Sequence, residues 1–341
     1  MIRFTEENGA LIARSRNETI RIEGWGNNAL RVRTTLLKKL PRDAHALTEN
    51  VAHSAKVTID EGSETAEIVN GKIKATVNGV GIICFYKDNE LILQEYYSYY
   101  YGSVRKEAIC YKIRSREYKG LASDDFKITV RFESDPKEKL FGMGQYQMPI
   151  LDLKGSVLPL EQRNSQVSVP FVVSNKGYGM LWNNPSTGEA AFGTNITKWI
   201  SDESDMVDYW ITADDTPAQI VTNYTECVGR APVMSKDYLG LWQCKLRYRT
   251  PDEVLEVARK YKELGIRLDV IVIDFFHWPH QGDWRFDEKY WSRDAVKAMT
   301  DELHAMGTKV MVSVWPSVDK RSENYYEMEQ KALISTTDVG S

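Results

Sequence analysis

Cysteine is scarce in this sequence, with four residues in a chain of 341. No two of them have the Cys-x-x-Cys spacing of a structural zinc site, and so few cysteines argue against a disulfide framework. The opening segment, residues 1–7, is polar and acidic, and no apolar stretch of a signal peptide follows it. We therefore expect a cytoplasmic protein with reduced thiols. The four cysteines are Cys84, Cys110, Cys227 and Cys244.

Long apolar runs and an excess of positive charge are also missing. No run approaches the roughly 20 apolar residues that cross a bilayer, so we expect no membrane partner. Lysine and arginine number 44 against 48 aspartates and glutamates, and the net charge of −4 argues against a nucleic-acid partner. No glycine-rich phosphate loop follows a predicted strand, and no Gly-x-Ser-x-Gly elbow is present. These absences disfavour a dinucleotide-binding fold and acyl-transfer chemistry.

Core-forming and aromatic residues are plentiful. Hydrophobic residues make up 42% of the chain and charged residues 27%, which suits a sizeable core and two or three domains. A single tryptophan is most simply explained by core packing. Clustered aromatic rings beside Asp and His side chains, however, are typical of sugar-binding sites. Five of the 9 tryptophans fall in the last third of the chain: Trp242, Trp278, Trp284, Trp291 and Trp315.

The first two thirds of the chain read as strands. Apolar and polar residues alternate over 127–132, and Asn-Gly pairs at 70–71 and 78–79 flank the run 72–77. Asn-Gly between apolar runs is a strong hairpin signal, so we predict an antiparallel β-sandwich. A short helix opens at Thr216-Pro217, with proline at its first position. Further strands are predicted at 29–33, 89–101, 167–173 and 207–211.

Strands and helices alternate after a linker at 229–232. Residues 250–253, Thr-Pro-Asp-Glu, combine an N-cap, a first-turn proline and a capping box. Repeating βα units predict a parallel sheet, and a (β/α)8 barrel needs about 250 residues, so residues 238–341 provide about three of its eight units. The pattern is therefore compatible with either a smaller α/β domain or an incomplete barrel. Strands are predicted at 239–244, 268–273 and 309–316, and helices at 250–264, at 294–306 and from about 323.

Four residues near the predicted carboxyl ends of these strands are candidates for binding. Asp274 directly follows the second strand, where it either meets a ligand in the barrel mouth or anchors its loop to backbone amides. Trp315 ends the third strand. Arg247 follows the first strand and either contacts substrate or forms a surface ion pair. Trp284 either lines the wall of a pocket or packs within a tight turn.

Metal binding has little support in the same region. His277 and His280 have His-x-x-His spacing, but they fall in a predicted loop and no third ligand accompanies them. We therefore expect no metal site.

Several motifs, taken in order, resemble glycoside hydrolase family 31. The likeness extends over nearly the whole chain, and within the family the stretches 247–248 and 274–278 are most similar to the bacterial α-xylosidase branch. Residues 141–145 and 175–184 look like the family's N-terminal sandwich, and residues 239–248, 268–274, 282–284 and 310–316 look like the opening of its catalytic barrel.

Members of that family are retaining α-glycosidases, so the resemblance implies an oligosaccharide substrate and no metal or organic cofactor. One Asp attacks the anomeric carbon, and a second carboxyl group, about 5–5.5 Å away, protonates the leaving oxygen. The resemblance implies that Asp274 binds hydroxyls of the sugar at the cleavage point, and that Phe275 and Phe276 line the same subsite. The sandwich loop that reaches over the barrel mouth corresponds to residues 161–164, with Asn164 as its candidate for sugar contact.

The resemblance also implies two domains, a galactose-mutarotase-like β-sandwich over 1–232 and an incomplete catalytic (β/α)8 barrel over 233–341. In the family the nucleophile follows the fourth barrel strand. We therefore expect the nucleophile and the acid/base beyond Ser341, because neither Asp319 nor Asp338 matches the nucleophile motif.

The foremost hypothesis is thus the N-terminal part of a retaining α-glycosidase acting on terminal α-linked xylose or glucose, above all an α-xylosidase. An α-glucosidase of the same family, a non-catalytic carbohydrate-binding protein and a truncated, inactive gene product are the alternatives. Whether the chain forms a homo-oligomer is left open.

Overall fold

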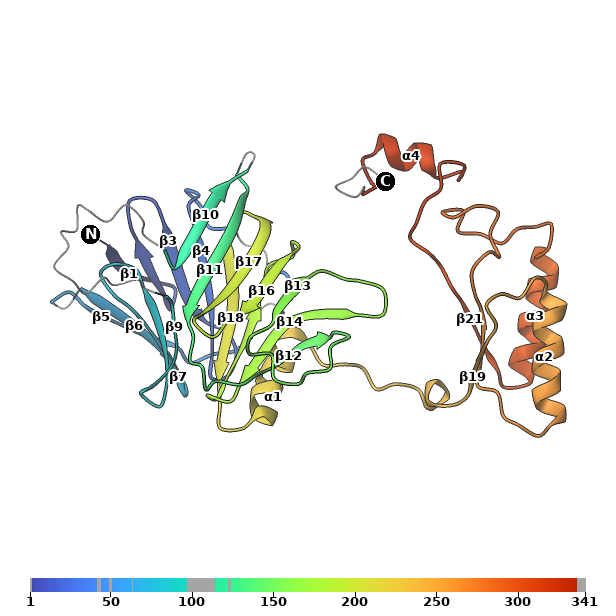
Figure 1. Cartoon of the computed structure of the whole chain (residues 1–341), viewed down its shortest axis with the longest axis horizontal. Coiled ribbons are helices and arrows are strands. Elements are labelled where there is room, and N and C mark those ends of the chain that lie inside the picture. Colours follow the sequence, from blue (N-terminus) through green and yellow to red (C-terminus); the bar gives the residue numbers. More distant parts are fainter. Residues whose placement is uncertain are drawn as a thin grey trace. The chain divides into compact units, whose positions relative to one another are not determined.

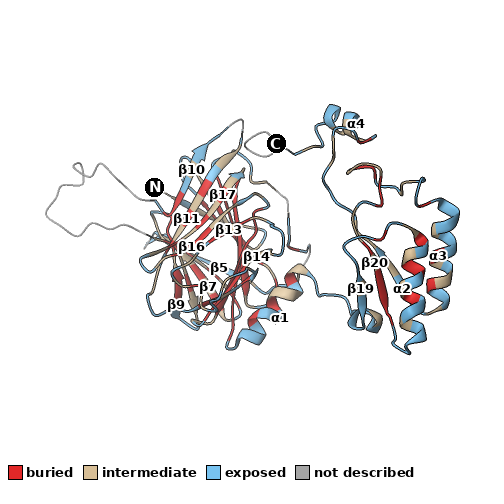
Figure 2. Cartoon of the chain, turned by 45° about the vertical axis from the view of Figure 1, so that its right-hand side comes forward, coloured by how far each residue is buried: buried red, intermediate tan, exposed pale blue. Residues whose placement is uncertain are grey.

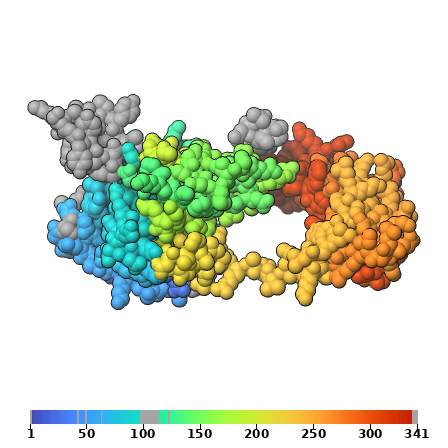
Figure 3. Space-filling model, turned by 60° about the horizontal axis from the view of Figure 1, so that its bottom comes forward, coloured from blue at the N-terminus to red at the C-terminus, as the bar shows by residue number. Residues whose placement is uncertain are grey.

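The computed structural model describes residues 2–41, 44–48, 51–62, 64–96, 114–121 and 124–335. The chain divides into two compact units, Met1–Arg230 and Ala231–Ser341. Residues 229–236 connect them and are exposed along their length (Figure 3). Cys110, Asp338 and the part of the predicted strand at 97–101 lie outside the described residues.

The described strands of the first unit form three sheets, and all of their ladders are antiparallel (Figure 1). The eight-stranded sheet has the spatial order β1 (Arg3–Glu7), β2 (Ala10–Arg14), β3 (Thr19–Gly24), β4 (Ala29–Thr35), β18 (Val207–Ala213), β15 (Tyr178–Trp182), β14 (Val167–Ser174) and β12 (Leu140–Gln145). One five-stranded sheet has the order β5 (Lys56–Asp60), β6 (Thr65–Asn70), β7 (Ile73–Val77), β8 (Ile83–Lys87) and β9 (Glu90–Gln94). The other has the order β10 (Arg116–Gly120), β11 (Phe126–Glu133), β17 (Ile196–Ser204), β16 (Gly188–Phe192) and β13 (Val157–Leu160).

The two five-stranded sheets together cover one face of the eight-stranded sheet. A bridge from Glu95 to Phe132 joins them at their edges. From the eight-stranded sheet, the Tyr209 ring meets Phe85 of one five-stranded sheet at 6.2 Å and Phe132 of the other at 5.8 Å. All three rings are fully buried, and apolar residues of all three sheets form one core. The predicted antiparallel β-sandwich is confirmed.

Helix α1 (Pro217–Val228) covers the opposite face of the eight-stranded sheet. It begins as the sequence predicts, because the Thr216 side chain accepts a hydrogen bond from the Gln219 backbone N–H (3.3 Å). Successive residues of a strand point to opposite faces, so Trp210, next to Tyr209, packs instead against Ile220 on the helix side.

The second unit is a three-stranded parallel sheet with two helices on one face (Figure 1). Figure 2 shows the buried sides of the two helices turned toward the sheet. Val254, Ala258, Met299 and Leu303 supply those sides and pack on Ile271. The elements are η2 (Lys236–Leu239), β19 (Trp242–Cys244), α2 (Pro251–Glu263), β20 (Val270–Ile273), α3 (Arg293–Ala305), β21 (Lys309–Val312) and α4 (Tyr325–Gln330).

These βα units confirm the predicted opening of a (β/α)8 barrel. All three strands predicted in this unit are longer than those observed, and β20 begins only at Val270. Residues 236–239 form a 3-10 turn instead of extending β19, and β21 ends at Val312 because its partner β20 ends at Ile273. Among the described helices, none is long and apolar enough to cross a bilayer.

Candidate functional site

The carboxyl ends of the three parallel strands meet at one edge of the second unit, and the face away from the helices is open. Cys244, Val272 and Met311 lie side by side in register on that face. Cys244 and Met311 are exposed, and the carboxyl group of Asp274 continues the same face two residues after Val272. In a closed barrel this face is the interior, so the edge beside Asp274 is the mouth.

The two carboxyl oxygens of Asp274 have different surroundings. Oδ1 accepts a hydrogen bond from the Phe275 backbone N–H (2.8 Å), which anchors the turn after β20. Oδ2 faces the Cys244 thiol, with 3.9 Å between Oδ2 and Sγ. Burial raises the pKa of the Cys244 thiol, and the Asp274 charge raises it further. The thiol therefore stays protonated and donates toward Oδ2, which remains available to a ligand hydroxyl.

Aromatic side chains gather next to Asp274. The Phe275 ring stacks on Trp315 with centroids 5.3 Å apart and lies 4.5 Å from the Phe276 ring. Trp278 lies 6.0 Å from Trp315, and the Trp284 indole N–H donates to the Trp315 carbonyl oxygen (3.1 Å). Phe276 and Trp284 keep about half of their surface exposed, at 50% and 52%. Exposed flat rings beside a carboxylate suit a sugar ring.

Arg247 joins this cluster. The Arg247 guanidinium carbon lies 5.3 Å over the centroid of the Phe276 ring, which is a cation–π contact. Asn164 belongs to the first unit, where it is exposed on a turn and accepts a hydrogen bond from the Ser165 hydroxyl (3.5 Å).

Sequence reasoning missed the role of Asp283, which ties two loops together. Asp283 is 2% exposed. Oδ1 accepts from the Glu323 N–H (2.8 Å) and Oδ2 from the His280 N–H (3.1 Å). Burial alone would raise the pKa of Asp283, but hydrogen bonds from Glu323, Ser322 and His280 lower it below the usual value. The loop that carries Trp284 is thereby fixed to the segment that follows β21.

His277 is a second residue whose role the sequence did not predict. It is buried, and its Nδ1 lies 3.0 Å from the Asp274 carbonyl oxygen. The Asp-x-x-His spacing is the only signal in the sequence for this turn contact. Within the described ranges, no three His, Cys, Asp or Glu side chains are grouped in a way that could hold a metal ion.

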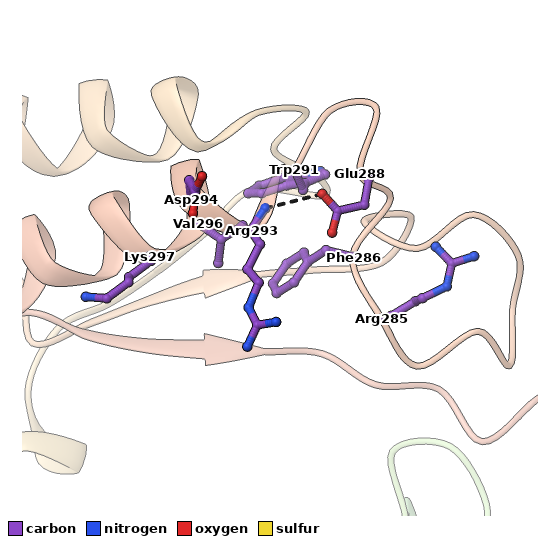
Figure 4. A pocket seen from close by; sticks show the side chains of 8 residues that line it. All are labelled: Arg285, Phe286, Glu288, Trp291, Arg293, Asp294, Val296 and Lys297. Carbon is purple, nitrogen blue, oxygen red and sulfur yellow. Dashed lines mark hydrogen bonds between the residues drawn. The ribbon is translucent and has the colours of Figure 1, made fainter.

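A separate pocket of about 490 Å³ lies at the start of α3. Figure 4 shows Phe286 and Trp291 beside it, with the Arg293 backbone N–H donating to Glu288 (3.3 Å). None of the predicted sugar-site residues lines this pocket, so we do not place the sugar site here. Its lining residues are Arg285, Phe286, Glu288, Trp291, Arg293, Asp294, Val296 and Lys297.

Two family models match the chain. Residues 19–190 match the glycosyl hydrolase 31 N-terminal galactose mutarotase-like domain, and residues 231–341 match the glycosyl hydrolases family 31 TIM-barrel domain. The chain belongs to glycoside hydrolase family 31. The family resemblance inferred from the motifs is confirmed.

Members of family 31 resemble the chain over nearly all of its length. An uncharacterized family 31 glucosidase of Pseudescherichia vulneris is 44% identical and covers 100% of this chain. Alpha-xylosidase A of Aspergillus niger is 31% identical over 95% of this chain. A solved GH31 alpha-xylosidase from a soil metagenome, complexed with xylose, superposes with a TM-score of 0.88 at 45% identity over 97% of this chain. The chain spans 65%, 45% and 49% of these three proteins respectively.

Proposed function

We propose that the protein is a retaining α-glycosidase that removes terminal α-linked xylose from oligosaccharides. The observation that carries the proposal is the placement of Asp274 at the carboxyl end of β20, with Oδ2 facing the exposed Cys244 thiol and aromatic rings beside it. Similarity to two proteins named alpha-xylosidases supports the choice of sugar. Because the chain spans about half of each of those two proteins, we assign both catalytic carboxylates to sequence that it does not contain.

In this proposal each mouth residue has a binding role. Asp274 Oδ2 accepts hydrogen bonds from hydroxyls of the sugar at the cleavage point. Phe275 and Trp315 form a stacked wall, and Trp284 extends it. Phe276 narrows the mouth under Arg247. Asn164, from the sandwich turn, is proposed as a further sugar contact. No metal, cofactor, nucleic acid or membrane enters this scheme.

Xylose differs from glucose by lacking one hydroxymethyl group. A permissive pocket separates two such sugars by only about 1–3 kcal/mol, so discrimination depends on crowding at that group. The adjacent Phe275 and Phe276 rings, 4.5 Å apart, provide bulk beside Asp274. An α-glucosidase is the second candidate, because the P. vulneris relative is named a glucosidase.

The test uses the full-length polypeptide encoded by the source gene, with nitrophenyl α-xyloside and nitrophenyl α-glucoside as substrates. The proposal predicts hydrolysis with a higher kcat/KM for the xyloside. A higher kcat/KM for the glucoside would replace it with the α-glucosidase. Sugar binding without turnover of either substrate would favour a non-catalytic binding protein.

A further inference from the structure

The turn that follows β20 holds a phenylalanine in an unfavourable backbone conformation. Phe276 has φ of 62°, in the left-handed region that bulky L-residues rarely adopt. Such a conformation persists only where neighbouring contacts fix it, and it is common at functional sites. The Asp274 Oδ1 bond to the Phe275 N–H closes one side of this turn. A second contact, from His277, closes the other.

His277 reaches back under the turn. The residue is 5% exposed, and its imidazole contacts the rings of Trp278, at 4.6 Å, and Phe286, at 5.0 Å. Nδ1 lies 3.0 Å from the Asp274 carbonyl oxygen. A carbonyl oxygen has lone pairs and no proton, so Nδ1 must carry the hydrogen of this bond.

The protonation state of His277 agrees with this assignment. Burial lowers the pKa of the imidazole, although the hydrogen bond to the Asp274 carbonyl and the Asp274 charge both raise it. The ring is therefore neutral at pH 7. A neutral ring with hydrogen on Nδ1 leaves Nε2 bare, a tautomer that the hydrogen bond selects.

We propose that His277 is a positioning residue for the sugar site. Its Nδ1–H closes the turn over Asp274–His277, and the closed turn sets the directions of the Asp274 carboxylate and the Phe276 ring. This inference rests on the proposed function. His277 acts from beneath the site, because it is buried while Phe276 remains half exposed.

Three variants of the full-length enzyme test the role. His277→Asn keeps an N–H close to the position of Nδ1, and His277→Leu keeps apolar volume without a donor. His304→Leu is the control, because His304 is an exposed histidine in the last turn of α3. All three are compared with the parent on nitrophenyl α-xyloside.

We expect His277→Leu to lower kcat/KM about tenfold, chiefly through KM, as loss of one buried hydrogen bond would. His277→Asn should recover most of that loss, and His304→Leu should match the parent. Equal kcat/KM for the parent and His277→Leu, or equal losses in His277→Asn and His277→Leu, would overturn the positioning role. A parent inactive on every α-glycoside would instead overturn the proposed function.

A spectroscopic measurement on the 341-residue chain tests the turn without any substrate. Nitrogen-15 NMR distinguishes the two neutral tautomers of each of the 5 histidines. We expect one histidine with hydrogen on Nδ1 at pH 7, and its signals should disappear in His277→Asn. Hydrogen on Nε2 of His277 would contradict the contact with Asp274 and overturn the inference.

Discussion

Replacing Asp283 with asparagine should lower the free energy of unfolding of the second unit by about 1–3 kcal/mol. Both carboxyl oxygens of Asp283 accept hydrogen bonds from backbone N–H groups, of Glu323 at 2.8 Å and of His280 at 3.1 Å. An asparagine has one oxygen and one amide nitrogen, which cannot accept. One buried N–H therefore loses its acceptor, and that penalty sets the magnitude.

The loss should also reach the proposed sugar site. Asp283 precedes Trp284, whose indole N–H donates to the Trp315 carbonyl oxygen (3.1 Å). The neighbouring Gly282 has φ of 94° and little space, because an added Cβ would lie 2.8 Å from Val318 Cγ1. The close packing at Gly282 therefore leaves this loop little room for another conformation. A weakened Asp283 contact should raise KM of the full-length enzyme.

Urea unfolding followed by tryptophan fluorescence measures the effect. Five of the 9 tryptophans lie in the second unit, so its unfolding is visible in the emission. Asp301→Asn is the control, because Asp301 pairs with Lys297 on the surface (2.6 Å), and it should give no measurable change. An Asp283→Asn variant as stable as the parent would refute the reasoning.

Three further predictions follow from contacts elsewhere. Arg247→Ala removes a cation–π contact with Phe276 worth about 0.5–1 kcal/mol, so KM of the full-length enzyme for α-xyloside should rise a few-fold. The rise in KM should be smaller for Arg247→Lys. Arg31→Met leaves the Asp208 carboxylate, 0% exposed, without its main partner, and should cost about 3–5 kcal/mol in urea unfolding of the first unit. The lowered pKa of His277 means that the unfolded chain binds its proton more readily, so stability should rise with pH from that lowered pKa up to about the ordinary 6.5. The pH dependence of the urea midpoint should flatten in that window in His277→Asn.

The architecture was predictable because local patterns and packing agree. The apolar faces of both barrel helices and the caps at Thr216 and Thr250 follow from residue spacing alone. Strand ends were less predictable, because they depend on a partner. Val314 and Trp315 continue the apolar pattern after β21, yet the strand ends at Val312 where β20 no longer pairs with it.

The candidate site was likewise predictable in part. The positions of Asp274 and Trp315 after their strands follow from the βα pattern. The contacts of Asp283 and His277 depend on turn conformation, in particular on the left-handed Phe276, which no sequence periodicity specifies. The contact between Arg247 and Phe276 forms only when two loops fold together. From the sequence, Arg247 could only be considered as a substrate contact or as part of an ion pair.

The central claim is that Asp274 binds the sugar at the cleavage point. The most direct test is kcat/KM of full-length Asp274→Ala on nitrophenyl α-xyloside, beside Asp287→Ala from the following loop. The account predicts a loss of roughly 10- to 150-fold for Asp274→Ala, as expected when a charged hydrogen-bond acceptor worth about 1.5–3 kcal/mol is removed, and near-parent activity for Asp287→Ala. Parent-like kcat/KM in Asp274→Ala would contradict it.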